Sequence, residues 1–223
     1  MNKLVTELFG DWKSASRYSR VPDHYVPVPA INDKIETPDK QNALFLAQMA
    51  LKMSDDDPDY AAIIIAGAVF GGSPNSRLFQ RIRVKDGLSY GAYGEFEVPT
   101  KDDGGAFSAS AIAAPQNMPK VEADFNDELA RALKDGFTDD EVTKAKKTWL
   151  DDRSVSRAEE TSIAGQLSGR ERWGRTLLWD AKLEAAVAAL TTEQVNAAFK
   201  RHVDPATVSI VKGGDFKKAG VYQ

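Results

Sequence analysis

Residues 70–94 read FGGSPNSRLFQRIRVKDGLSYGAYG, and they join one predicted helix to a second helix and then to a strand. The pair Gly71-Gly72 is expected to end the first helix, because glycine is the poorest helix former after proline. Ser73 suits an N-cap and Pro74 the first helical position, so a second helix is predicted from there to about Asp86. A glycine pair beside a serine can also bind phosphate, but the spacing and the lysine of a P-loop are missing, so the pair is interpreted as a break between helices.

Toward the C-terminus the sequence predicts a hairpin and then several helices. Leu88–Val98 is rich in aromatic residues, Gly104–Ala113 shows strand-like alternation, and a short loop joins them. Thr138 and Glu141 have the spacing of a capping box that opens a long helix. Apolar spacing and caps predict helices over residues 119–134, 138–168 (with breaks), 177–190 and 192–203, and a closing strand over residues 207–211.

Toward the N-terminus two further strands and a buried helix are predicted. Val26–Ile35 alternates in places, and Asn42–Met53 fits either period but is interpreted as a strand. Asp59–Phe70 is apolar almost all round, which is typical of a buried helix. Consecutive strands with tight connections, followed by helices, predict an α+β fold in which an antiparallel sheet has helices packed on one face.

The first residues differ in pattern from the rest of the chain. Leu4, Val5, Leu8 and Phe9 have helical spacing, and a polar stretch with three prolines occupies residues 12–29. We therefore expect residues 1–25 to be the closing helix of a preceding segment and a linker. Residues 26–223 are expected to form one domain.

Composition excludes several classes of function. The 223 residues carry a net charge of −4 without a long single-sign run, so neither a nucleic-acid nor a membrane partner is expected. The chain has no cysteine, which excludes disulfides, thiolate zinc sites and cysteine nucleophiles. Its two histidines, His24 and His202, are far apart, whereas a catalytic zinc usually has three protein ligands, so no metal site is predicted in this chain.

The segment quoted above closely resembles the C-terminal domain of the M16 (pitrilysin-like, insulinase-like) zinc peptidases. The resemblance is carried by the glycine pair after a helix, by the run Ser76-Arg77-Leu78-Phe79, by Arg83 in Ile82-Arg83-x-Lys85, and by Leu88-x-Tyr90. Residues 37–41 resemble the family's entry to this domain, and residues 137–147 resemble its capped long helix. The similarity extends over nearly the whole predicted domain.

The resemblance implies two half-domains that enclose a chamber. In the family one half carries zinc on an H-x-x-E-H helix, in which the glutamate is the general base. Here the corresponding helix, at about residues 59–70, has neither histidine nor glutamate, and H-x-x-E-H occurs nowhere in the sequence. The zinc is therefore expected in a partner half, in the same polypeptide or in a separate subunit, and this chain is expected to be inactive alone.

By the same resemblance, Arg83 and Tyr90 would be the auxiliary catalytic and substrate-binding residues of this half. The Arg83 guanidinium would donate to peptide carbonyls, and the Tyr90 hydroxyl would face the scissile carbonyl, with extended substrate along a strand edge. In the ordinary interpretation, an arginine late in a helix is solvated and a tyrosine early in a strand packs. Arg77 and Arg81 on the same helix are interpreted as surface or salt-bridge residues.

The leading hypothesis is thus a substrate-binding, zinc-free half of an M16-type metallopeptidase that hydrolyses peptides only with a zinc-bearing half. The alternative is a non-catalytic structural core subunit of an M16-like assembly. An independent serine hydrolase is disfavoured because no G-x-S-x-G is present. The sequence leaves the compartment open, with the bacterial periplasm favoured over the cytoplasm.

Overall fold

A computed structural model describes residues 2–222, so the first residue of the predicted segment 1–25 and the last of the predicted domain 26–223 lie outside it. These residues form a five-stranded sheet with the order β1-β5-β2-β4-β3. Its strands are β1 (Asn32–Glu36), β2 (Ala43–Lys52), β3 (Ser89–Glu97), β4 (Gly104–Ala113) and β5 (Ser209–Gly214). Every neighbouring pair is antiparallel except β1 and β5, which are parallel.

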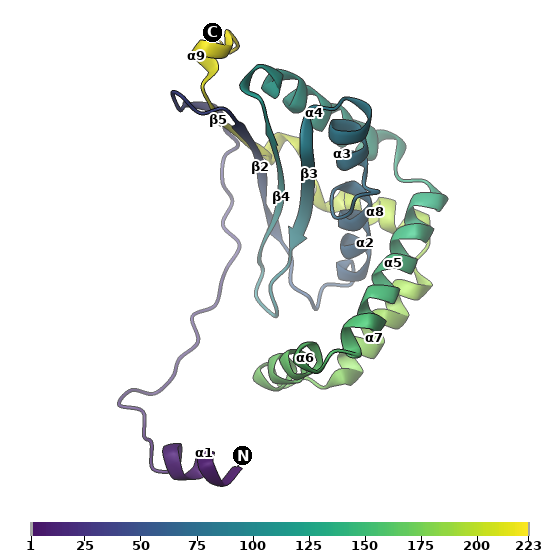
Figure 1. Ribbon diagram of the computed structural model, residues 1–223. Coiled ribbons are helices and arrows are strands. Elements are labelled where there is room, and N and C mark those ends of the chain that lie inside the picture. Colours follow the sequence, from purple (N-terminus) through teal and green to yellow (C-terminus); the bar gives the residue numbers. More distant parts are fainter. Residues whose placement is uncertain (1, 223) are drawn as a thin grey trace.

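Helices pack against one face of this sheet, so the α+β prediction is confirmed (Figure 1). They are α1 (Asn2–Phe9), α2 (Tyr60–Phe70), α3 (Arg77–Phe79), the π-helix η1 (Gln80–Lys85), the 3-10 helix η2 (Pro115–Asn117), α4 (Met118–Asp135), α5 (Asp139–Arg157), α6 (Glu160–Arg172), α7 (Leu177–Ala189), α8 (Thr192–His202), the 3-10 helix η3 (Pro205–Thr207) and α9 (Phe216–Ala219). The long helix predicted over residues 138–168 is broken between α5 and α6, as the sequence analysis allowed. The predicted capping box is present, because Thr138 Oγ1 accepts from the Glu141 amide while the Glu141 carboxylate accepts from the Thr138 amide.

Alternation along β2 separates the two faces of the sheet. Phe45 and Met49 are buried under the helices, whereas Leu44 and Leu46 point to the opposite face and remain partly exposed. The same alternation occurs in β4, where Phe107 is buried. One face of the sheet is therefore packed and the other is bare within the described chain, which is a common arrangement for antiparallel sheets.

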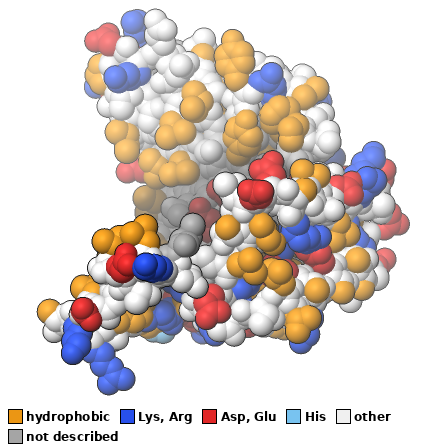
Figure 2. Space-filling view, turned by 60° about the horizontal axis from the view of Figure 1, so that its bottom comes forward, with side chains coloured by type: hydrophobic (Ala, Val, Ile, Leu, Met, Phe, Trp, Pro, Cys, Tyr) orange, Lys and Arg blue, Asp and Glu red, His pale blue; other side chains and the backbone are white. Residues whose placement is uncertain are grey.

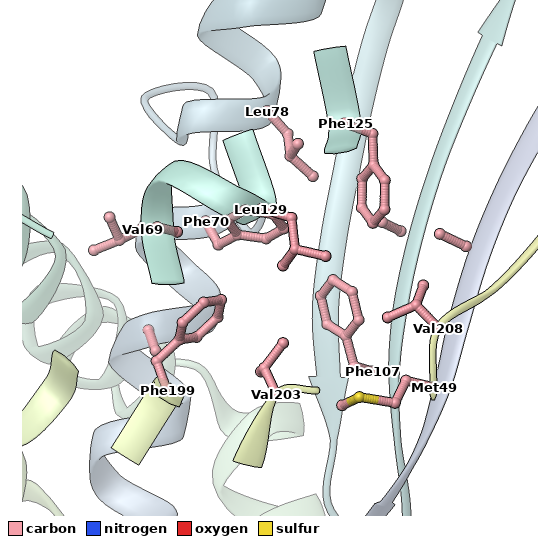
Figure 3. Packing of buried hydrophobic residues seen from close by; sticks show 14 of the residues in the cluster. Met49, Val69, Phe70, Leu78, Phe107, Phe125, Leu129, Phe199, Val203 and Val208 are labelled. Atoms are coloured by element: carbon pink, nitrogen blue, oxygen red, sulfur yellow. The ribbon is translucent and has the colours of Figure 1, made fainter. Parts of the chain in front are cut away.

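The core between the sheet and the helices is built around phenylalanine rings (Figure 3). The ring of Phe70 in α2 lies 5.8 Å from that of Phe107, 6.3 Å from that of Phe125 and 5.7 Å from that of Phe199. Helix α2 thus contacts the sheet on one side and other helices on the other. This explains why its sequence is apolar all round.

Three predicted boundaries are wrong. The helix after Gly71-Gly72 begins at Arg77 with Ser76 at the N-cap, because Ser73 and Ser76 form a turn in which the Ser76 amide donates to the Ser73 carbonyl. The first strand begins at Asn32 rather than at residue 26, since only there does the chain pair with β5. The last strand begins later than predicted and includes Gly213-Gly214, because both glycines pair with β1.

Helix α1 lies at the end of an extended segment, away from the sheet and its helices (Figure 1). Its apolar residues Leu4, Val5, Leu8 and Phe9 are all exposed. The extended segment meets the hairpin loop, where the Gly104 amide donates to the Asp23 carbonyl and the Tyr25 amide donates to the Asp103 carboxylate.

Among the described residues, no helix is both long and apolar enough to cross a bilayer. On the face seen in Figure 2, basic and acidic side chains are intermingled, and neither sign forms a continuous field.

Candidate functional site

The structure places Arg83 and Tyr90 side by side. The Arg83 guanidinium donates a hydrogen bond to the backbone carbonyl of Tyr90. Its Cζ lies 6.0 Å from the centroid of the Tyr90 ring and 5.4 Å from that of the Phe79 ring, within the range of cation–π contacts. The side chain of Tyr90 is 92% exposed, so its hydroxyl is free to meet a ligand.

Arg83 owes its position to the π-helical turn η1, which continues α3 alongside β3 (Figure 1). The Asp86 amide donates to the Arg81 carbonyl at 3.1 Å, five residues back, and the Leu88 amide donates to the Ile82 carbonyl at 2.9 Å. A π-turn contains one more residue than an α-turn and changes the direction of the side chains around it; such turns are frequent at functional sites. The sequence pattern predicts an ordinary helix here and gives no sign of the π-turn.

An ion cluster holds the end of the π-turn. Arg81 Nε lies 2.9 Å from an Asp86 carboxylate oxygen, Arg81 Nη2 lies 3.1 Å from Asp124, and Lys120 Nζ lies 2.7 Å from Asp86. The hydrogen bond from Lys120 holds the pKa of Asp86 at about 2. Burial, together with the neighbouring Asp86, raises the pKa of Asp124. The interpretation of Arg81 as a salt-bridge residue is therefore confirmed, and so is that of Arg77, which pairs with Glu141 at 2.7 Å.

Tyr90 projects because β3 is irregular at its start. The register with β4 shifts between Ser89 and Ala92, so Tyr90 and Gly91 bulge out of the ladder. The Ser89 hydroxyl accepts from the Gly91 amide at 3.1 Å and lies 2.5 Å from the Ile112 carbonyl, which satisfies backbone groups that the ladder leaves unpaired. The Tyr90 carbonyl in turn accepts a hydrogen bond from the Arg83 guanidinium. The bulge is therefore anchored, and the Tyr90 side chain is directed outward.

A pocket of about 730 Å³ opens next to Tyr90. Its walls come from the turn before β3, from the first part of β3 and from the bare sides of β2 and β4; they include Leu44, Leu88, Tyr93 and Ile112. The Tyr93 ring lies directly over Gly91, where an added Cβ would come within 2.7 Å of it. This pocket was not predicted from the sequence. The alternation of aromatic and small residues in SYGAYG (89–94) was the available signal.

The predicted substrate edge is partly closed. Strand β3 lies at the edge of the sheet, but the Gly94 amide donates to the Gly71 carbonyl at 3.1 Å. The two backbones are so close that a Cβ on Gly71 would lie 2.4 Å from the Gly94 nitrogen. This close approach explains why residue 71 is a glycine: a side chain there would collide with the backbone of Gly94. The backbone edge of β3 is therefore closed at Gly94.

One cluster of possible metal ligands occurs among residues 2–222. Asp57, Asp59 and His202 place ligand atoms within 4.8 Å of one another at the start of α2. His202 Nε2 lies 2.9 Å from Asp59 Oδ2, and the Arg201 guanidinium binds the same oxygen. Because an arginine already neutralises Asp59, we assign the cluster to the packing of α8 against α2 and not to a metal.

The fold and the site define an α+β domain that presents an arginine–tyrosine pair beside a bare sheet face. The profile of the peptidase M16 inactive domain matches residues 1–148. The chain therefore belongs to the M16 peptidase inactive-domain family. Among curated proteins no sequence match is found.

Solved structures share this fold. An M16 peptidase inactive domain from Pseudomonas fluorescens is 30% identical, with a TM-score of 0.72 over 83% of this chain and 44% of that chain. A protease from Helicobacter pylori is 14% identical, with a TM-score of 0.79 over 95% of this chain and 51% of that chain. An inactive peptidase domain from Bordetella parapertussis is 18% identical, with a TM-score of 0.65 over 77% of this chain and 91% of that chain. The chain thus spans about half the length of the first two proteins.

Proposed function

We propose that this chain is the substrate-binding, zinc-free half of an M16-type metallopeptidase and acts on peptides together with a zinc-bearing half. The observation that carries the proposal is the exposed Tyr90 side chain, fixed by a bulge and by Arg83, in a domain of the M16 inactive-domain family. The chain has no H-x-x-E-H, so hydrolysis by this chain alone is not expected.

Tyr90 would act as a hydrogen-bond donor to the reacting peptide carbonyl. Its phenol can donate to the oxygen on which negative charge develops, and one such donor lowers the barrier by about 3–4 kcal/mol. Such a donor works best when it is preorganised, and the Ser89-supported bulge would hold the backbone of Tyr90 in place before the substrate binds. The zinc of the partner half would supply the activated water.

Arg83 would contact the same peptide substrate next to Tyr90. One of its N–H groups is engaged by the Tyr90 carbonyl, and the planar guanidinium has further donors for carbonyl oxygens of an extended peptide. Backbone groups of β3 on the Tyr90 side of Gly94 would add hydrogen bonds to the peptide. Binding and transition-state contacts would therefore come from one end of β3.

A structural core subunit is the second candidate function. It is favoured by the contacts of Arg83, because its hydrogen bond to Tyr90 and its contact with Phe79 would stabilise the fold without any substrate. In that case neither side chain would affect hydrolysis except through folding.

Cleavage of a quenched fluorogenic peptide distinguishes the substrate-binding half from the structural core subunit. The zinc-bearing half is assayed without this chain, with the wild-type chain, with Tyr90→Phe and with Tyr18→Phe. Tyr18 is a matched control, since it is 78% exposed but lies in the N-terminal linker. We expect the wild type and Tyr18→Phe to support cleavage equally and Tyr90→Phe to reduce kcat on the order of a hundredfold. Equal activity of all three forms would support the core-subunit function.

A further inference from the structure

We infer that Arg81 and Asp124 are positioning residues, which hold the π-turn in the form that directs Arg83 toward Tyr90. The inference rests on the proposed function and adds to it two side chains that would contact neither the peptide nor the zinc. Neither Arg81 nor Asp124 belongs to the sequence motifs that predicted Arg83 and Tyr90.

Both ends of the π-turn are tied to about one turn of α4. Near the start of the π-turn, Arg81 Nη2 lies 3.1 Å from the Asp124 carboxylate; at its C-cap, Asp86 lies 2.7 Å from Lys120 Nζ. Lys120 Nζ lies 3.5 Å from the Asp124 carboxylate, and Arg81 Nε lies 2.9 Å from the Asp86 carboxylate. The four side chains of this ion cluster therefore form a closed ring of alternating charge, with two members on the π-turn and two on α4.

The π-turn needs such support because its geometry is uncommon. In an α-helix a carbonyl accepts from the amide four residues further on, but the Arg81 carbonyl accepts from the Asp86 amide, five residues further on, at 3.1 Å. Relaxation to an α-turn would shift the chain by one residue and change the direction of the side chains in and after the turn by up to about 100°. Arg83 would then no longer face the Tyr90 carbonyl.

Arg81 is the member of the ion cluster with the most contacts to α4. Only 20% of its side chain and 4% of the Asp124 side chain are exposed, so water and salt weaken their attraction little. Its guanidinium also lies 3.4 Å from the Asp127 carboxylate and 3.8 Å from that of Glu128. A guanidinium can donate to several carboxylates at once, whereas a lysine ammonium is a single point charge. Removal of Arg81 should therefore release the π-turn from α4.

The first test follows Arg83 directly and does not need the zinc-bearing half. In the chain labelled with ¹⁵N-arginine, the Arg83 guanidinium protons should exchange slowly with solvent, because this group donates to the Tyr90 carbonyl. In Arg81→Met and in Asp124→Asn the exchange should become at least about tenfold faster. A sample of Arg83→Lys identifies the Arg83 signals.

The second test is a double-mutant cycle with the zinc-bearing half and a fluorogenic peptide. Arg81→Met should lower kcat/KM about tenfold, and Arg83→Ala about 100-fold. If Arg81 acts through Arg83, the double variant should lose no more than Arg83→Ala alone, whereas independent effects would multiply to about 1,000-fold. Arg81→Lys keeps the charge and is the milder variant if Arg81→Met does not fold. Its smaller loss should likewise vanish in the Arg83→Ala background.

Arg153→Met is the matched control. The Arg153 side chain is 21% exposed, close to the 20% of Arg81, and it also binds two carboxylates of a neighbouring helix, those of Asp180 and Glu184 in α7. Arg153→Met should destabilise the fold to a similar extent in urea unfolding. It should leave the Arg83 signals and the kcat/KM of the folded protein unchanged.

The outcomes distinguish this inference from the proposed function. Unchanged slow exchange of the Arg83 guanidinium in both folded variants would overturn the inference, and so would multiplied losses in the double variant. An equal loss of kcat/KM in Arg153→Met would overturn it too, since general stability would then explain the effect. If Arg83→Ala is fully active while Arg81→Met still frees the Arg83 guanidinium, the role of Arg83 in hydrolysis fails and its positioning by Arg81 and Asp124 stands.

Discussion

The guanidinium of Arg83 donates to the backbone carbonyl of Tyr90, so one candidate site residue fixes the main chain of the other. The contact requires the π-turn, which directs Arg83 toward β3, and the bulge, which presents the Tyr90 carbonyl to it. Under the proposed function Arg83 would therefore have two tasks: to hold the bulge and to meet the substrate. The two tasks predict different behaviour for different substitutions.

Arg83→Ala removes both tasks, and Arg83→Lys keeps only the charge. We expect kcat/KM with the zinc-bearing half to fall about 100-fold in Arg83→Ala and less in Arg83→Lys, which cannot form a planar fork. The free energy of unfolding should fall by about 0.5–1 kcal/mol in Arg83→Ala, because an exposed side chain loses its hydrogen bond to the Tyr90 carbonyl. Steady-state kinetics and urea unfolding on the same samples test this. Full activity of Arg83→Ala would remove Arg83 from the site.

The ion cluster behind the π-turn makes a prediction about titration. Lys120→Met should raise the pKa of Asp86 from about 2 toward its ordinary 3.8, because the hydrogen bond from Lys120 is the main cause of the shift. A carboxylate with a lowered pKa stabilises the fold above its unfolded pKa, and this contribution is lost as the pH falls from about 3.8 toward 2. NMR titration of the Asp86 carboxyl carbon measures the change.

Lys144→Met is the control for this titration. Lys144 forms an exposed pair with Asp140 in α5, and neither residue belongs to the ion cluster of Arg81, Asp86, Lys120 and Asp124. The pKa of Asp86 should be the same in this variant as in the wild type. A shift of equal size in both variants would mean that net charge, and not the local contact, sets the pKa.

The close approach of Gly71 and Gly94 predicts a large effect of a single methyl group. In Gly71→Ala the Cβ would lie 2.4–2.8 Å from backbone atoms of Gly94, which cannot yield without moving β3. We expect a loss of about 3 kcal/mol in the free energy of unfolding. Lower activity with the zinc-bearing half should accompany it, since β3 carries Tyr90. Urea unfolding measures the loss in the free energy of unfolding.

Gly165→Ala is a control of opposite sign. Gly165 lies inside α6 with no atom within 4 Å of its would-be Cβ, so alanine should stabilise the protein by about 0.5–1 kcal/mol. If both glycine variants destabilise the protein equally, the effect of Gly71→Ala does not come from its contact with Gly94.

Local patterns in the sequence predicted most of the fold. The buried helix α2, the strand β2 (whose sequence fits either period) and the capping box at Thr138 each depend on neighbours in the chain, and each is confirmed. The α+β class follows from their order. Features that depend on distant segments were not predictable in this way. The parallel pairing of β1 with β5 joins residues almost 180 positions apart, and no periodicity records it.

The candidate site illustrates the same limit. Arg83 and Tyr90 were identified through a family resemblance, whereas their contact depends on a π-turn that helix periodicity does not encode. Ser73-Pro74 looks like a helix start, but the chain forms a turn there before α3 begins. The pocket is assembled from three separate strands and a turn. Its residues are individually ordinary, and only the register of the sheet brings them together.

A buried ion cluster near the C-terminus predicts how the protein responds to acid. Lys212 in β5 lies 3.1 Å from the Glu122 carboxylate, which also accepts from Asn32 at 2.9 Å and from the Tyr222 hydroxyl at 2.8 Å. Burial opposes ionisation of Glu122, but the hydrogen bonds from Asn32, Tyr222 and Lys212 outweigh it and lower its pKa. Stability from this group is present above the ordinary glutamate pKa of 4.5 and is lost as the pH falls through the lower folded pKa.

Two substitutions test this cluster. Lys212→Met should lower the free energy of unfolding at pH 7 by about 3 kcal/mol, because it leaves a largely buried carboxylate without its cation. Glu122→Gln should flatten the dependence of stability on pH below about pH 4.5 relative to the wild type. Lys147→Met, which breaks an exposed pair with Asp151, should change stability by less than about 1 kcal/mol. Urea unfolding between pH 3 and 7 compares the four proteins. An equally steep acid dependence in Glu122→Gln would mean that other carboxylates cause the loss, and that the Lys212 cluster is not the acid-sensitive element of this fold.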